Sequence, residues 1–300
     1  MNIFKILIII IITFLYIFCN FYIFYLFYKK LKCYKKSFVT CNYNGGLGNQ
    51  FFQIYTTISY SIDNNKNPIF QYKNTTGYRS TYWDSVFKNL NTRDINCIKW
   101  ENIKENSSGT YNIDNQIKNK NIMFNGYFQS KHNFIKNMKK INDIIGIDKI
   151  KLQTKEKYKN LFNNNDKIIA IHFRIGDYKK LSDEFNILND EYYINALKNI
   201  DIKNKKIFVF CEKEDIETVK NRLKNILKDD KKFIIISNNE VDDIFLISLC
   251  DYIIIANSTF SFWGAMFANH KNVYLPIFNW FGDKKNTEDR FCLDGWKIIN

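Results

Sequence analysis

The sequence predicts an α/β fold with parallel sheets, preceded by one membrane-spanning helix. In the second half of the chain, short β-branched runs alternate with helical patterns. Strands without polar alternation are buried on both faces of a parallel sheet, and the helices supply that cover. A similar strand in the first half ends at a glycine-rich turn, and the amino-terminal segment is almost wholly apolar. We divide the chain into a membrane anchor with its basic flank (1–36), a first domain (37–150) and a second domain (151–300).

The amino-terminal segment has the length and composition of a signal anchor. Residues 6–28 carry no charged side chain, and no small-residue cleavage site is visible after them. We expect a single-pass membrane protein, type II in the Golgi or secretory pathway, or in a host membrane if the gene is viral. The lysines within residues 29–36 favour the opposite orientation, with the globular part in the cytosol, so the topology stays open.

The net charge and the small number of metal-binding side chains limit the kinds of ligand that we expect. The formal net charge of +14 suits an anionic ligand such as a nucleotide, although lysine is abundant along the whole chain. No basic stretch alternates with aromatic residues, so we do not expect nucleic acid as a partner. Seven cysteines without a CxxC pair, three scattered histidines and no DxD triplet argue against a metal site. We therefore expect neither a metal nor another cofactor.

Two Asn-x-Ser/Thr sequences are possible glycosylation sites if the globular part faces a lumen. These are Asn74 and Asn106, each in a polar, irregular region. A third, at Asn257, follows a predicted buried strand, where we do not expect a glycan.

The first domain shows fewer regular elements than the second. A strand is predicted over 38–43, followed by the glycine-rich turn and a helix over 49–62. A weak helical pattern occurs near 83–90. A second strand is predicted over 121–129, with a helical pattern continuing to about residue 145. The charged stretch 150–166 is the candidate domain boundary.

The second domain alternates strands with helices. The predicted strands cover 167–173, 206–211, 233–237, 251–256 and 272–277. The predicted helices cover 192–200, 215–227, 242–250 and 258–268. In such sheets ligands bind beyond the carboxyl ends of the strands, where loops lead into helix N-termini. The strand–helix junctions of the second domain are therefore the candidate ligand-binding positions.

The sequence HFRIGDY follows the first strand of the second domain. It places His172, Arg174 and Asp177 within six positions. A guanidinium is a planar fork that suits phosphate oxygens and stays charged when partly buried. The alternative is a salt-bridged turn with a buried histidine.

Two further junctions carry polar clusters. In NSTFSFWGA, Ser258, Thr259 and Ser261 stand where a helix begins, and can cap the helix or hold a phosphate. Asp242 and Asp243 open the preceding helix. One of them suits the helix dipole, and the other could accept hydrogen bonds from a guanine edge.

The run NGGLGNQFFQ (44–53) joins the first strand to the first helix. Taken alone it is either a tight turn or a phosphate cradle. It contains no lysine, and the chain has neither GxxxxGK[ST] nor GxGxxG. A P-loop NTPase and a dinucleotide oxidoreductase are therefore disfavoured.

Four motifs in order resemble the α-1,2-fucosyltransferase family, glycosyltransferase family 11. They are GGLGNQFFQ (45–53), GYFQS (126–130), HFRIGDY (172–178) and ANSTFSFWGA (256–265). The resemblance spans about 44–283. It implies a GT-B-like architecture of two Rossmann-like domains with a nucleotide cleft between them. It also implies metal-independent, inverting transfer of fucose from GDP-fucose, commonly to the 2-hydroxyl of galactose.

The resemblance implies roles for individual residues. Arg174 would bind the donor pyrophosphate, and His172 and Asp243 would lie near guanine. Asp177 is a candidate for the carboxylate that assists the attacking hydroxyl. Three hydroxyls would lie near the β-phosphate of the donor, those of Ser258, Thr259 and Ser261. From the first domain, the donor would be contacted by Gly45, Gly46 and Asn49. Ile175 stands where many members have a second arginine, which leaves the donor sugar open.

Two other functions stay open. One is a GT-B transferase that uses another nucleotide sugar. The other is a membrane-anchored glycan-binding protein with a decayed transferase fold. Release of GDP from GDP-fucose, but not from other nucleotide sugars, would distinguish the fucosyltransferase from both.

Overall fold

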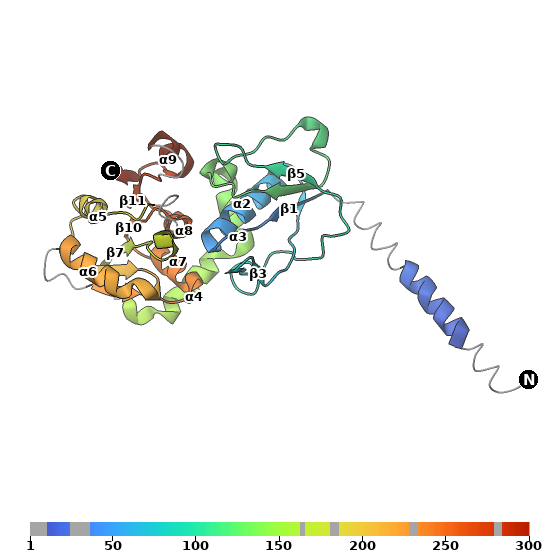
Figure 1. Ribbon diagram of the computed structural model, residues 1–300, viewed down its shortest axis with the longest axis horizontal. Coiled ribbons are helices and arrows are strands. Elements are labelled where there is room, and N and C mark those ends of the chain that lie inside the picture. The colour runs from blue at the N-terminus through green and yellow to red at the C-terminus, as the bar shows by residue number, and fades with distance from the viewer. Residues whose placement is uncertain are drawn as a thin grey trace, which may run out of the picture.

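The protein contains two parallel sheets with helices packed around them (Figure 1). The structure is a computed structural model and describes residues 11–24, 37–162, 166–180, 186–227, 233–278 and 284–299. The side chains of Asp177 and Lys180 also lie outside this description. The predicted α/β class with parallel sheets is confirmed.

The first sheet has the strand order β2-β1-β6-β5, and its neighbouring strands are parallel. Its strands are β1 (Phe38–Asn42), β2 (Asn67–Pro68), β5 (Glu101–Lys104) and β6 (Ile122–Asn125). A short antiparallel hairpin, β3 (Thr75–Thr76) with β4 (Arg79–Ser80), lies outside this sheet. Strands β1 and β6 lie in the middle of this sheet, between β2 and β5. The chain leaves β1 toward β2 through a helix, and it leaves β6 toward the second sheet.

Three helices accompany the first sheet. Helix α2 (Leu47–Asp63) follows β1, and α3 (Met138–Ile145) and α4 (Ile147–Lys157) follow β6. Gly146, at a φ of +87°, turns the chain between the last two. Helix α4 runs through residue 150, where we placed the domain boundary, and packs against a helix of the second sheet.

The second sheet has the order β12-β11-β10-β7-β8-β9, again with parallel neighbours. Its strands are β7 (Lys167–His172), β8 (Lys205–Phe210), β9 (Phe233–Ile236), β10 (Tyr252–Ile254), β11 (Val273–Pro276) and β12 (Lys297–Ile299). Its helices are α5 (Asp190–Leu197), α6 (Ile216–Leu227), α7 (Glu240–Ser248), α8 (Thr259–Ala268) and α9 (Lys284–Phe291). Numbered along the chain this is 6-5-4-1-2-3, the order of a Rossmann fold, with the switch point between β7 and β10.

The prediction of a weak helix near residues 83–90 is wrong, because the segment is a series of turns. Its apolar side chains Trp83, Val86 and Phe87 are buried in the core of the first domain. The amide of Phe87 donates to the carbonyl of Tyr82 over 2.9 Å, five residues back, which is not the α-helical spacing. Burial of the large side chains therefore decides the local backbone.

One aromatic core joins the two sheets. Helix α2 packs against helix α8, and Trp263 of α8 lies 4.4 Å from Tyr55 and 5.1 Å from Phe51, between ring centroids. Phe262 stacks on Phe52 at 5.1 Å and is fully buried. The contact between the domains is therefore a continuous hydrophobic core.

The amino-terminal helix covers residues 11–24 in the structure, and its large apolar side chains are each more than half exposed. Among the described residues, no helix has the length and apolarity needed to cross a membrane. The remainder of the predicted membrane segment, 6–10 and 25–28, lies outside the described residues. Membrane anchoring stays a prediction.

Candidate functional site

A cleft of about 1170 Å³ lies between the carboxyl ends of the two sheets. On the first domain it is lined by residues that follow β1, β5 and β6. On the second it is lined by residues that follow β7, β8, β9 and β10. The switch point of the second sheet, between β7 and β10, therefore opens into this cleft, which is where an open α/β sheet binds its ligand.

The three glycines of the turn before α2 have different structural roles. Gly45 has a φ of +78°, a conformation that disfavours other residues. Gly46 is the N-cap of α2, and a Cβ built on it would meet no atom within 4 Å. A Cβ on Gly48 would lie 2.5 Å from the carbonyl carbon of Thr259 and 2.6 Å from the nitrogen of Phe260. Gly45 thus allows the tight turn, Gly46 leaves the cleft wall open, and Gly48 allows the two helices to come into close contact.

Asn49 connects the two domains through its side-chain oxygen. This oxygen accepts hydrogen bonds from Thr259 Oγ1 over 2.9 Å and from Gln129 Nε2 over 2.8 Å. Asn49 lines the cleft, as do Gly45 and Gly46. Asn49, a predicted contact of the sugar donor, is therefore also part of a hydrogen-bond network between the two domains.

The N-termini of helices α2 and α8 meet at this point. Each helix N-terminus carries a partial positive charge and amides without a carbonyl partner in the helix, so together they favour an anion. Ser258 is the N-cap of α8, and its hydroxyl accepts the amide of Phe260 over 3.3 Å. Ser258 and Thr259 line the cleft, whereas Ser261 is fully buried, donates to the carbonyl of Ala256 and does not line it.

Arg174 follows strand β7 and forms an ion pair with Glu212, which follows the neighbouring strand β8. Its guanidinium lies over the ring of Tyr178, 5.3 Å from the centroid. A Cβ on Gly176 would collide with the Glu212 carboxylate, so glycine leaves room for this pair. Sequence reasoning missed Glu212, although β8 follows β7 along the chain and parallel neighbours end at the same edge.

His172 is buried at the end of β7 and lines the cleft. Burial, with the positive charge of Arg174, lowers its pKa to about 3, so the imidazole is neutral near pH 7. Within the described part of the chain its Nδ1 has no hydrogen-bond partner. A neutral imidazole can accept at one nitrogen and donate at the other.

The two aspartates of α7 have different surroundings. Asp242 accepts from Lys157 Nζ over 2.6 Å and from Tyr158 Oη over 2.9 Å, so it ties α7 to α4. Asp243 lines the cleft and accepts the backbone and side-chain N–H groups of Asn238 over 3.0 and 2.9 Å. Burial raises the pKa of Asp243 to about 6.

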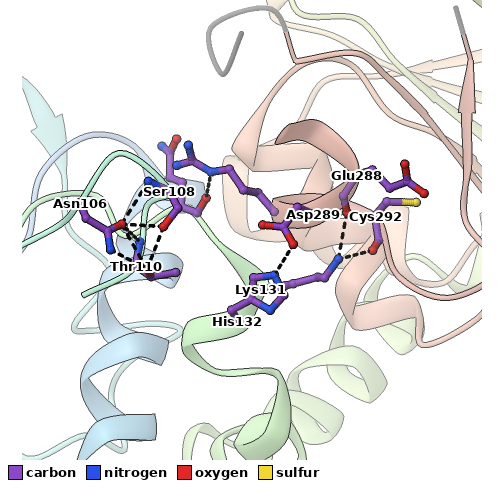
Figure 2. Close-up of polar contacts among 10 residues, drawn as sticks. Asn106, Ser108, Thr110, Lys131, His132, Glu288, Asp289 and Cys292 are labelled. Atoms are coloured by element: carbon purple, nitrogen blue, oxygen red, sulfur yellow. Dashed lines mark hydrogen bonds and ion pairs between the residues drawn. The ribbon is translucent and has the colours of Figure 1, made fainter. Parts of the chain in front are cut away.

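Helix α9, which was not predicted, ties the second domain to the first. Lys131 Nζ donates to the carbonyls of Glu288 and Cys292 over 2.9 and 2.6 Å, and His132 lies 3.0 Å from Asp289 (Figure 2). Arg290 of the same helix lines the cleft. Its guanidinium donates to the carbonyls of Gln129 and Ser107 over 3.1 and 3.2 Å. The sequence KKNTEDRF lacks an apolar face, so the helix is not predictable from its own sequence and depends on these tertiary contacts.

Of the two possible glycosylation sites, Asn74 lies in an exposed turn and Asn106 lies at the cleft. The Asn106 side chain closes a turn, because its oxygen accepts the amides of Ser108 and Thr110 (Figure 2). The side chain of Asp177, the candidate base, is outside the described residues. In the described part of the chain no three His, Cys, Asp or Glu side chains are grouped to hold a metal ion.

Solved structures of fucosyltransferases are among those similar in shape. A mutant of FUT1 from Arabidopsis thaliana in complex with GDP matches with a TM-score of 0.47 and 10% identity, covering 83% of this chain and 74% of that one. Fucosyltransferase NodZ from Bradyrhizobium matches with a TM-score of 0.46 and 12% identity, covering 77% and 92%.

Sequence comparison gives a more specific result. An α-1,2-colitosyltransferase from Escherichia coli is 29% identical over 291 residues, covering 88% of this chain and 99% of the relative. The O-antigen biosynthesis glycosyltransferase WbnK from Escherichia coli is 27% identical over 148 residues, covering 46% and 47%. The sequence model of glycosyl transferase family 11 matches residues 9–300. The chain therefore belongs to glycosyl transferase family 11 and is a glycosyltransferase.

Proposed function

We propose that the protein transfers fucose from GDP-fucose to a glycan hydroxyl, the 2-hydroxyl of a galactose-type residue, with inversion and without a metal ion. The observation that carries this proposal is the meeting of the α2 and α8 N-termini beside Arg174 in one cleft. The GDP leaving group gains negative charge as the bond to fucose breaks. Fixed N–H groups and a guanidinium stabilise such charge in the transition state.

We propose the remaining donor contacts among the residues that line the cleft. His172 and Asp243 take the guanine end, where a neutral imidazole and a carboxylate pair with the edge of the base. Ser258 and Thr259 lie at the β-phosphate, with Gly46 on the opposite wall. The buried hydroxyl of Ser261 supports the start of α8 instead.

The reaction is a direct displacement at the anomeric carbon. The acceptor oxygen attacks from the face opposite GDP, the bond to the phosphate oxygen breaks, and the hydroxyl proton goes to a base. We keep Asp177 as the proposed base. The Asp177→Asn variant should lose transfer to the acceptor, while it should still hydrolyse GDP-fucose slowly and so release GDP.

The name of one relative suggests a second candidate donor. The 29% identical protein is named a colitosyltransferase, so colitose is the second candidate for the donor sugar of this chain. The nucleotide contacts proposed above would be the same for both sugars.

The deciding experiment measures GDP release and product linkage with the full chain in detergent. We expect turnover of GDP-fucose or GDP-colitose, an α-1,2-linked product on a β-galactoside, no turnover of UDP-sugars, and unchanged rates in EDTA. Loss of activity in EDTA would refute metal independence. No release from any donor, with glycan binding intact, would favour the glycan-binding alternative.

Membrane attachment is part of the proposal. The exposed apolar side chains of residues 11–24 suit a lipid environment and a single-pass anchor. The full chain should stay with membranes after carbonate extraction, whereas a variant lacking residues 1–36 should not. Protease protection of the globular part in sealed vesicles would decide its orientation.

A further inference from the structure

The proposed donor contacts do not account for the whole cleft. Ligand pockets usually measure roughly 300–1,000 Å³, and this cleft measures about 1170 Å³. On its first-domain wall, Glu105, Tyr78 and Tyr127 line the cleft and have no assigned role. These three side chains are available to contact a second substrate.

Glu105 is held in place by backbone groups of the GYFQS motif. It follows β5, and its two carboxylate oxygens accept the amides of Tyr127 over 2.8 Å and Phe128 over 2.7 Å. A Cβ on Gly126 would lie 2.9 Å from one of these oxygens, so glycine makes room for the carboxylate. The motif therefore builds a fixed seat for one acidic side chain.

The backbone of this seat adopts an uncommon conformation. Phe128 is fully buried and has a φ of +52°, in the left-handed region that large side chains avoid. Residues held in such regions cluster at ligand sites, where the surrounding structure enforces them. Here the enforced turn aims the amide of Phe128 at the Glu105 carboxylate.

The chemistry of this wall fits a sugar. Each carboxylate oxygen has a lone pair left after accepting one amide, and an ionised carboxylate binds hydroxyl donors strongly. Tyr127, whose backbone amide holds this carboxylate, lines the cleft and is 44% exposed, and Tyr78 is 87% exposed. Aromatic rings offer an apolar face to the C–H side of a sugar ring and a polar hydroxyl at the edge.

We propose that Glu105 binds hydroxyls of the acceptor sugar, with Tyr127 as the adjoining wall, and thereby selects the acceptor. This inference rests on the proposed function, because it assumes a glycan acceptor. Glu105 positions the acceptor toward the donor and takes no proton in the reaction.

The test compares Glu105→Gln with Glu101→Gln. Glu101 begins the same strand, and its carboxylate forms an ion pair with Lys120 Nζ at 3.1 Å. Neither residue of this pair lines the cleft. We expect Glu105→Gln to raise the acceptor KM about tenfold or more, as for loss of a hydrogen bond to a charged group. The KM for the donor and GDP release without acceptor should stay within twofold. Glu101→Gln should leave all three unchanged.

Tyr127 provides a second test that leaves the seat intact, because its contact with Glu105 is through the backbone. Tyr127→Leu should raise the acceptor KM, and Tyr127→Phe should restore most of it. An acceptor KM within twofold of wild type in both Glu105→Gln and Tyr127→Leu, with both variants folded, would overturn the inference.

Direct binding separates this inference from the proposed reaction. Saturation-transfer NMR with methyl β-galactoside and GDP should show binding by the wild type and loss in Glu105→Gln, even if no donor is turned over. Absence of donor turnover would refute the proposed function alone. Equal binding of the galactoside by both proteins, or by neither, would refute the role of Glu105.

Discussion

Gly48 at the start of helix α2 lies against the main chain of Thr259 at the start of helix α8. A Cβ on Gly48 would lie 2.5 Å from the Thr259 carbonyl carbon, and no side-chain rotation can relieve a contact with backbone. We expect Gly48→Ala to lower the free energy of unfolding by about 1–3 kcal/mol, as overpacking does in cores. Urea denaturation of the full chain in detergent would measure it.

Gly46→Ala is the matched control, because a Cβ there meets open space. Its unfolding free energy should change by less than about 1 kcal/mol, the scale of an N-cap substitution. Its affinity for GDP should fall, since the methyl group would stand in the cleft. Equal destabilisation by the two substitutions would show that the helices do not touch at Gly48.

Arg174 is expected to carry most of the leaving-group stabilisation. Arg174→Ala should lower kcat about 10²–10³-fold, the usual cost of removing one such donor, and Arg174→Lys should recover only part because it lacks the planar fork. Kinetics with GDP-fucose and an acceptor in excess would show it. Near-normal turnover by folded Arg174→Ala protein would defeat the mechanism.

The stability of Arg174→Ala needs a control, because it leaves Glu212 without its ion-pair partner. The double variant with Glu212→Gln removes both charges. If the double variant has the unfolding free energy of the wild type and is still inactive, the activity was lost because the guanidinium is missing and not because the protein is destabilised.

Donor affinity should depend on pH through Asp243. Its pKa is raised by burial from 3.8 to about 6, so the carboxyl gains a proton as the pH falls below 6. If the ionised form binds guanine, the affinity for GDP-fucose should fall by up to tenfold per pH unit below 6. Calorimetry between pH 5 and 8 would measure it, and Asp243→Asn should show weak binding without this step.

His172 should not contribute to that step, because its pKa of about 3 keeps it neutral throughout the range. The stability effect of Asp243 has the opposite sign to its effect on binding. Since the folded protein holds the proton more tightly, the free energy of unfolding should decrease as the pH rises from 3.8 to about 6. An unchanged profile in Asp243→Asn would contradict the assignment.

Ile175 does not point into the cleft. It is 3% exposed and belongs to the apolar cluster of the second domain that includes Phe173 and Tyr192. Ile175→Arg should destabilise the protein by about 3 kcal/mol or more, because it buries an unpaired charge, and should not raise kcat. Ile175→Leu should cost less than about 1.5 kcal/mol. A faster, equally stable Ile175→Arg protein would show that this side chain reaches the donor.

Five of the six strands of the second sheet were predictable because they are continuous apolar runs rich in β-branched residues. The edge strand β12 was not predicted. The predicted strands also pointed to Arg174 and Ser258, because each comes shortly after a strand and lines the cleft. Glu105 was not predictable, because β5 is the polar edge strand ENIK, in which only Ile103 is buried. Its identity as a strand depends on pairing with β6, about 20 residues later in the sequence.

The pairing of Arg174 with Glu212 illustrates a second limit. Each residue follows a predicted strand, but their contact requires knowing that β7 and β8 are neighbours. Helix α9 shows the same limit, since hydrogen bonds from the first domain hold a sequence without an amphipathic pattern. Contacts between segments that are distant in the sequence, more than local sequence patterns, therefore complete the cleft.

The aromatic core shared by the two sheets has a consequence for engineering. Trp263 from one half is enclosed by Phe51, Tyr55 and Phe134 from the other, so neither half has a complete interior without its counterpart. The halves cannot be exchanged between relatives as independent modules. A chimera must inherit both partners of this aromatic contact, together with Phe128 of the loop that follows β6, because that side chain is part of the same core.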